Sequence, residues 1–285
     1  MMLASMLPEA DLVIVADVEA LLCGPRHASG PAAEALLDTT AKGVPLVFCS
    51  TRTRAEIEAV QKDLGFVHPF ICESGAAVFV PAGYFGVEVP HARRVDDYDV
   101  VEFGPRYADV VASLRRRAAT ARIDIVGFHD LSAAEIAAEC GLSIAAAERA
   151  RRREYGEAFR IVRRNNRSLI ALRRALRADK LTLTCGGWFE HVGPRVDEGQ
   201  GISLVRRLFE RVRGPVLTVG FGDPLADVSL LRHVDVPIMT PLPFLPRSAR
   251  LLAKACRCAT PDEHRLRRRV YQRLDVRSHR PTACM

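Results

Sequence analysis

A pair of carboxylates follows an apolar run near the start of the chain. In "LVIVADVEALL", residues 12–22, Asp17 and Glu19 stand two positions apart, directly after branched aliphatic residues. A carboxylate beside buried apolar surface costs free energy unless a hydrogen bond or an opposite charge compensates it. The pair is therefore a candidate for chemistry that needs acids.

Two later apolar runs also end on polar residues. Ser50 ends "VPLVFCS", residues 44–50, and Asp223 ends "PVLTVGFGD", residues 215–223, with Asp227 four positions later. Taken alone, each of these residues is well explained as a helix cap or a turn residue. Polar groups after three separate runs are harder to explain as independent caps.

The apolar runs are short, continuous and rich in valine and isoleucine, which is typical of strands buried in a parallel sheet. Residues 29–43 and 53–65 have helical spacing, and the second segment begins with a Thr53–Glu56 capping box and ends at Gly65. Further predicted elements are two short strands about a Glu-Ser-Gly turn at 69–81, helices at 202–214 and 224–234, and strands at 215–223 and 235–239. This alternation predicts an α/β fold with a Rossmann-like parallel sheet.

Residues 86–190 have a different texture. They contain three predicted arginine-rich helices, at 113–121, 145–159 and 169–178, and a few amphipathic strands. We predict that they form an α+β domain inserted into the α/β core. The predicted division is a first core part at 1–85, the inserted domain at 86–190, a second core part at 191–246 and a basic tail at 247–285.

The net charge of +7 is concentrated in that tail. Residues 247–285 hold eleven Lys or Arg and three acids, whereas residues 1–246 hold 30 basic and 31 acidic groups. A solvated tail explains this better than nucleic-acid binding, because no nucleic-acid motif accompanies it. No apolar stretch approaches a membrane span. No signal peptide is expected, and the eight cysteines are interpreted as reduced thiols, so the predicted location is the cytoplasm.

The carboxyl ends of parallel strands form one edge of an open sheet, where ligands bind. Several acids that meet there repel one another, and a hard cation such as Mg²⁺ relieves this repulsion. A carboxylate beside Mg²⁺ can attack a phosphoryl group and form an aspartyl phosphate. Ser50 is placed to hold a phosphate oxygen. The residues therefore predict magnesium-dependent phosphoryl transfer.

These residues resemble the haloacid-dehalogenase (HAD) superfamily and, within it, the mannosyl-3-phosphoglycerate phosphatase family. The resemblance runs from about residue 12 to residue 240. Its segments are "CSTRTRAEIEAVQKDLG…PFICESGAAVFVPAGYF" at 49–85, "LSAAEIAAECGLSIAAAERARRREYGEAF" at 131–159, "CGGWFEHVGPRVDEGQG" and "GFGDPLADVSLL". It implies a HAD core with an inserted cap domain, and a phosphatase acting on a small phosphate ester such as a phosphorylated sugar acid.

The resemblance also implies roles for individual residues. Asp17 corresponds to the nucleophile and a Mg²⁺ ligand, and Glu19 to the acid/base, whose backbone carbonyl also reaches the metal. Ser50 corresponds to the phosphoryl-binding residue, while Asp223 and Asp227 complete the metal site. Residues expected near the substrate are Arg52, Arg153, Gly186, Gly187 and Arg195.

Five positions depart from the family pattern. Glu19 replaces the second aspartate of the first motif, and Leu21 replaces its threonine. The phosphate-binding lysine of the third motif falls on Glu198, for which Arg195 or Lys180 is a hypothetical substitute. The remaining departures are Ala226, in place of an asparagine, and Trp188, in place of an arginine.

These departures leave a second interpretation open. A fold that kept its sheet and acids but lost efficient catalysis could bind a ligand or a partner instead. His191 is interpreted as a packed or exposed strand histidine rather than a metal ligand. The sequence does not determine the substrate, the oligomeric state or the role of the tail.

Overall fold

A computed structural model describes residues 11–19, 39–162, 166–186, 189–223 and 226–239. Most of the helix expected at 29–43, and the whole basic tail at 247–285, lie outside the described residues. The chain divides into two compact units, residues 1–47 with 209–285 and residues 48–208. No described helix has the length and apolar character that a membrane crossing requires.

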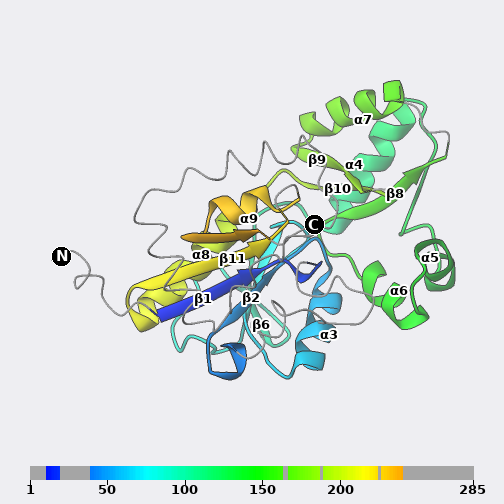
Figure 1. The fold of residues 1–285 in the computed structure, drawn as a ribbon. Coiled ribbons are helices and arrows are strands. Elements are labelled where there is room, and N and C mark those ends of the chain that lie inside the picture. Colours follow the sequence, from blue (N-terminus) through cyan, green and yellow to red (C-terminus); the bar gives the residue numbers. More distant parts are fainter. Residues whose placement is uncertain (1–10, 20–38, 163–165, 187–188, 224–225, 240–285) are drawn as a thin grey trace, which may run out of the picture. The chain divides into compact units, whose positions relative to one another are not determined.

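The first unit contains three parallel strands in the order β12-β11-β1 (Figure 1). They are β1 (Asp11–Ala16), β11 (Val216–Gly222) and β12 (Val236–Met239). Residues 12–16 of β1 are all buried, as expected for a strand covered on both faces. The strands predicted at these positions are confirmed. The short helix α9 (Val228–Arg232) packs on β11 and buries Leu230 and Leu231.

The second unit contains a mixed sheet whose strand order is β2-β3-β4-β6-β5. Its strands are β2 (Leu46–Cys49, which begins in the first unit), β3 (Phe70–Cys72), β4 (Ala77–Pro81), β5 (Arg93–Val95) and β6 (Tyr98–Glu102). Among these strands only the β2–β3 pair is parallel, whereas β3 and β4, the two short strands predicted about the turn at 69–81, pair antiparallel. The reason is local, because the turn between β3 and β4 is too short for a parallel crossover.

Helix α3 (Arg54–Leu64) follows β2 and confirms the helix predicted at 53–65. The Thr53 side chain accepts from the Glu56 N–H, the Glu56 side chain accepts from the Thr53 N–H, and Gly65 ends the helix in the left-handed conformation. Helix α8 (Glu198–Arg213), predicted at 202–214, begins four residues earlier and runs from the second unit into the first.

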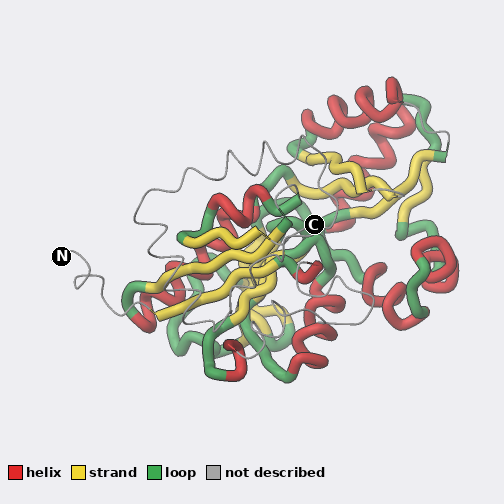
Figure 2. Tube along the Cα trace, viewed as in Figure 1, coloured by secondary structure: helices red, strands yellow, loops and turns green. Residues whose placement is uncertain are grey.

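A second, four-stranded antiparallel sheet lies within the unit of residues 48–208 (Figure 2). Its strands, in order, are β7 (Ile125–Gly127), β8 (Glu157–Ile161), β10 (Phe189–Pro194) and β9 (Leu181–Gly186). Phe159 and Ile161 pack with α4 (Tyr107–Thr120) and α7 (Asn166–Ala178). Ala158, on the opposite face, packs with α5 (Ala133–Cys140) and α6 (Ile144–Arg151). Alternate residues of β8 therefore bury against different helix pairs.

The helix predicted at 145–159 is wrong in its second half. Helix α6 ends at Arg151, and β8 begins at Glu157. The backbone N–H groups of residues 154–156 donate to the carboxylate of Glu73, so they do not continue a helical hydrogen-bond ladder. A contact distant in sequence has overridden local helix propensity.

Candidate functional site

The acids predicted for the metal site lie in the first unit, at the carboxyl ends of β1 and β11. Asp17 is only 7% exposed, and Glu19 is half-buried. The backbone N–H of Asp17 donates to the carbonyl of Phe221 at 3.0 Å. This bond therefore holds Asp17 beside Phe221 of β11, two residues before Asp223 in the chain.

Asp223 and Asp227 are bound to each other through the backbone. The Asp227 carboxylate accepts from the Asp223 N–H at 2.6 Å, and the Asp227 N–H donates to the Asp223 carbonyl at 2.9 Å. Gly222 permits this approach, since a Cβ at that position would lie 2.7 Å from the Cβ of Asp227. Asp223 also accepts from the Ala226 N–H at 3.2 Å.

The electrostatics show that three of these acids act on one another. Burial, together with the negative charges of Asp223 and Glu19, raises the pKa of Asp227 to about 6, against the hydrogen bond from the Asp223 N–H. Like charges that disfavour ionisation in this way must lie near one another. The charges of Glu19 and Asp223 are thus felt at Asp227, while a metal site formed by these acids stays a prediction.

The donor chemistry at this edge fits a hard divalent cation. Carboxylate oxygens are the ligands that Mg²⁺ prefers, and a cation there would relieve the repulsion that Asp227 experiences. Within the described ranges, no three His, Cys, Asp or Glu side chains already form a group able to hold a metal ion. The acids are adjacent but are not gathered as ligands.

The predicted phosphoryl-binding residue, Ser50, lies in the second unit after β2 and is 1% exposed. Its hydroxyl accepts from the Arg52 N–H at 3.3 Å, and its carbonyl accepts from the Ser74 N–H at 3.0 Å. The Glu73 N–H donates to the Arg52 carbonyl, also at 3.0 Å. The loop from Ser50 to Arg52 is therefore bonded along its backbone to the turn between β3 and β4.

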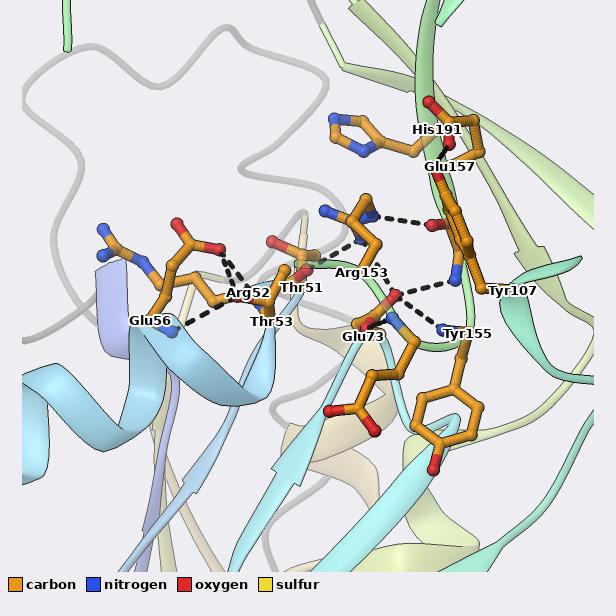
Figure 3. Close-up of polar contacts among 12 residues, drawn as sticks. Thr51, Arg52, Thr53, Glu56, Glu73, Tyr107, Arg153, Tyr155, Glu157 and His191 are labelled. Atoms are coloured by element: carbon orange, nitrogen blue, oxygen red, sulfur yellow. Dashed lines mark hydrogen bonds and ion pairs between the residues drawn. The ribbon is translucent and has the colours of Figure 1, made fainter. Parts of the chain in front are cut away.

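Arg153, predicted near the substrate, is fixed beside the same loop (Figure 3). Its Nε donates to the Gly156 carbonyl at 2.8 Å, and its Nη2 donates to the Thr51 carbonyl at 3.4 Å. The same Nη2 forms an ion pair with Glu73 at 3.4 Å. The Arg153 side chain is 8% exposed, which is unlike a solvated arginine on a helix face.

Tyr107, His129 and Glu157 form a hydrogen-bonded group at the start of β8 in the four-stranded sheet. The Tyr107 hydroxyl donates to Glu157, whose carboxylate also accepts from the His129 N–H. Burial raises the pKa of Glu157 above its ordinary value. His191 of β10 pairs with Ala158 of β8, and its pKa is lowered to about 4 by burial and by the positive charge of Arg153. His191 is therefore neutral at pH 7.

The remaining residues predicted near the substrate are Gly186, Gly187 and Arg195, and two altered positions, Trp188 and Glu198, lie in the same segments. Gly186 ends β9, while Gly187 and the altered position Trp188 lie outside the described residues. Arg195 is exposed and donates its backbone N–H to the Lys180 carbonyl at 2.8 Å. Glu198 begins α8, and its Cα would be 2.8 Å from a Cβ on Gly75. No contact in the described part of the chain brings Arg195 to Arg153.

Nothing in the sequence singles out Glu73 as a candidate site residue. It is 1% exposed on its side chain, and its carboxylate accepts from three successive backbone N–H groups. From the sequence alone, an acid in a turn between two strands is interpreted as an ordinary turn residue. The one available signal was its place inside "CESG", a segment that the resemblance already covered.

No family model matches the chain. A protein of Methanococcoides burtonii named glucosyl-3-phosphoglycerate/mannosyl-3-phosphoglycerate phosphatase is 32% identical over 232 residues, covering 81% of this chain and 85% of the relative. A protein of Persephonella marina with the same name is 35% identical over 202 residues, covering 70% and 73%.

One solved structure shows the same fold. It is a haloacid dehalogenase-like hydrolase from Bacteroides thetaiotaomicron, with a TM-score of 0.54 and 15% sequence identity. The match covers 87% of this chain and 100% of that one. The α/β fold expected from the sequence is thereby confirmed.

Proposed function

Because the chain belongs to the glucosyl-3-phosphoglycerate/mannosyl-3-phosphoglycerate phosphatase family of HAD hydrolases, we propose that it hydrolyses a phosphorylated sugar acid such as mannosyl-3-phosphoglycerate. It is a HAD-type phosphatase, and the substrate, the metal and the residue roles are what we propose. The observation that carries the proposal is the parallel pairing of β1 and β11, which places Asp17 and Asp223 after strand ends at the same edge of the sheet.

We propose Asp17, Asp223, Asp227 and the backbone carbonyl of Glu19 as the magnesium ligands. Bound there, Mg²⁺ would neutralise charge on the phosphoryl oxygens. Hard oxygen donors and mutual repulsion among the acids support this assignment.

In the proposed reaction Asp17 attacks phosphorus, and the bond from phosphorus to the sugar-acid oxygen breaks. Glu19 gives its proton to that leaving oxygen. It then takes a proton from a water molecule, whose oxygen attacks the aspartyl phosphate and releases inorganic phosphate and free Asp17. Asp17 is suited to this role because it is 7% exposed and follows a strand whose residues 12–16 are buried.

Ser50 is proposed to bind the transferring phosphoryl group. The proposed substrate contacts are Arg52, Arg153, Gly186, Gly187 and Arg195. Residues 86–190 are proposed as the cap that excludes bulk water from the reaction. The fixed guanidinium of Arg153 and its hydrogen bond to the Thr51 carbonyl support a role close to the phosphoryl-binding loop.

Two altered positions suggest slow turnover. The longer Glu19 displaces its carboxyl group by about one methylene, and a shift of about 1 Å can cost on the order of 10²-fold in rate. Glu198 replaces a cation with an anion, which opposes a phosphate dianion.

The test is an assay with and without Mg²⁺ on p-nitrophenyl phosphate and mannosyl-3-phosphoglycerate, with Asp17→Asn as the blank. Magnesium-dependent turnover well above the blank is expected, with preference for the sugar acid. Turnover equal to the blank would instead favour a HAD fold that binds a ligand without hydrolysing it.

A further inference from the structure

The turn at residues 73–75 contacts three segments that are proposed to act on the substrate. It bonds to the Ser50–Arg52 loop through the Glu73 and Ser74 N–H groups. Gly75 packs on the backbone of Glu198, and Glu73 binds the segment that carries Arg153. All of these residues belong to the unit of residues 48–208. The turn is thus a common support for segments that are far apart in the sequence.

The Glu73 carboxylate is the main attachment of the Arg153 segment. It accepts from the N–H groups of Glu154 at 2.7 Å, Tyr155 at 3.2 Å and Gly156 at 2.7 Å. Three successive N–H groups aimed at one anion form a preorganised binding site for a carboxylate. A Cβ on Gly156 would be crowded, because it would lie 3.3 Å from Glu73 Oε2 and 3.1 Å from the Val192 carbonyl.

The backbone of the turn is held in a costly conformation. Glu73 and Ser74 have φ values of 46° and 60°, in the left-handed region that side chains disfavour. Such a conformation persists when the surroundings determine it, and it occurs often at functional sites. The hydrogen bonds of Glu73 hold the turn in this conformation.

Glu73 leaves one part of the Arg153 guanidinium available. Nε and Nη2 are used by Gly156, Thr51 and Glu73. Among the residues that the structure describes, no hydrogen bond uses Nη1 of Arg153. A guanidinium held on one side offers its remaining N–H groups to a planar oxyanion at little cost in side-chain entropy.

We infer that Glu73 is a positioning residue, which holds Arg153 so that Nη1 binds an oxyanion of the substrate. This inference rests on the proposed function and adds to it how the Arg153 contact is built. The oxyanion is either the carboxylate of the sugar acid or the phosphoryl group, and the choice of substrate in the assay separates them.

The test compares Glu73→Gln with the unaltered protein. Gln keeps the size of the side chain but turns an NH₂ group toward the N–H donors and Arg153. We expect KM for mannosyl-3-phosphoglycerate to rise about tenfold while kcat changes less than about twofold. An unchanged KM for p-nitrophenyl phosphate identifies the carboxylate as the group bound by Arg153, and a parallel rise identifies the phosphoryl group.

A double-mutant cycle tests whether Glu73 acts through Arg153. In an Arg153→Ala background, Glu73→Gln should raise KM less than about twofold further, because the residue it positions is gone. Asp179→Asn is the matched control, since Asp179 pairs with Arg116 and Arg117 elsewhere in the same unit and should leave KM unchanged. A full tenfold effect in the Arg153→Ala background, or an unchanged KM in Glu73→Gln, would overturn the inference.

Two measurements keep the inference separate from the proposed function. Should the unaltered protein hydrolyse neither ester, the function fails, and calorimetric binding of mannosyl-3-phosphoglycerate takes the place of KM. Amide hydrogen exchange at Glu154, Tyr155 and Gly156 should accelerate at least about tenfold in Glu73→Gln. Equal exchange rates, or equal affinities, would show that Glu73 does not hold this segment for a ligand.

Discussion

The backbone N–H of Asp17 donates to the carbonyl of Phe221 at 3.0 Å, two residues before Asp223. This bond extends the parallel register of β1 and β11 by one residue beyond Ala16. The carboxylates that follow the two strands therefore lie at the same edge of the sheet. Had β1 and β11 been antiparallel, the two acids would lie at opposite edges, and no shared cation could be proposed.

Removal of the metal should abolish turnover. We expect activity to disappear with EDTA and to return with added Mg²⁺. Asp227→Asn should raise the Mg²⁺ concentration for half-maximal activity about tenfold, since it removes one anionic ligand but keeps an oxygen that accepts from the Asp223 N–H. Magnesium titrations of initial rate measure this. Turnover that persists in EDTA would contradict the proposed cofactor.

Shortening Glu19 should accelerate the reaction. Glu19→Asp moves the carboxyl group back by about one methylene, and we expect kcat to rise between about 10-fold and 100-fold. The control is Glu19→Gln, which has the same length but no proton to exchange, and should lower kcat. A decrease in kcat for Glu19→Asp at saturating substrate would show that the active site has adapted to the longer acid.

Restoring a cation at position 198 should strengthen substrate binding. Two charges about 4 Å apart interact by up to about 4 kcal/mol at an effective dielectric near 20, and the sign is unfavourable for Glu198 and a phosphate. We expect Glu198→Lys to raise kcat/KM at least about tenfold, with the neutral Glu198→Gln in between. A lower kcat/KM for the lysine variant than for the glutamine variant would place this side chain away from the phosphate.

Two glycines with similar backbones should respond differently to alanine. Gly75 and Gly83 have φ values of 88° and 73°, but only at Gly75 would a Cβ meet backbone, 2.8 Å from the Cα of Glu198. We expect Gly83→Ala to lower the free energy of unfolding by about 1 kcal/mol, from the left-handed backbone alone. Gly75→Ala should cost at least about 2 kcal/mol more, because of the added clash. Urea unfolding of both variants measures the difference.

Lowering the pH should reduce the contribution of Glu102 to the free energy of unfolding. Hydrogen bonds from Arg93, then from Arg106 and Tyr155, lower the pKa of Glu102 from 4.5 to about 2, against the effect of burial. Because the folded pKa is the lower one, the carboxylate stabilises the fold above pH 4.5, and this stability is lost as the pH falls toward about 2. Arg93 and Arg106 are exposed, so the expected contribution is about 1–2 kcal/mol.

The comparison for Glu102 is with Glu102→Gln. At pH 7 the variant should unfold with a free energy about 1–2 kcal/mol smaller, and the difference should narrow in unfolding titrations as the pH falls from about 5 to about 3. A difference that stays constant over this range would assign the effect of the variant to packing.

The sequence predicts well the parts of this fold that local chemistry controls. Helix α3 needed only Thr53, Glu56 and Gly65, because a capping box and a left-handed glycine mark helix ends without help from the rest of the chain. The strand β1 needed only its continuous apolar run. The acids after β1 and β11 followed from the rule that parallel strands end at one edge.

Contacts between distant segments could not be predicted in the same way. Residues 152–156 follow α6 and are predicted from the sequence to continue it. Their departure from the helix depends on Glu73, which is 81 to 83 positions away from its three N–H donors. Nothing in the local pattern of either segment indicates the other. The same holds for the Thr53 hydroxyl, which donates to the Arg149 carbonyl at 2.9 Å.

The long separation between Glu73 and its three N–H donors has a kinetic consequence. Closing a loop of this length lowers the conformational entropy of the chain before the contact stabilises it, so such pairings form slowly. The backbone after α6 should therefore reach its native course late, once β3 and β4 have already formed their hairpin. Until then residues 152–156 lack the contact that follows the end of α6, so we expect this segment to be more helical early in folding than in the native state.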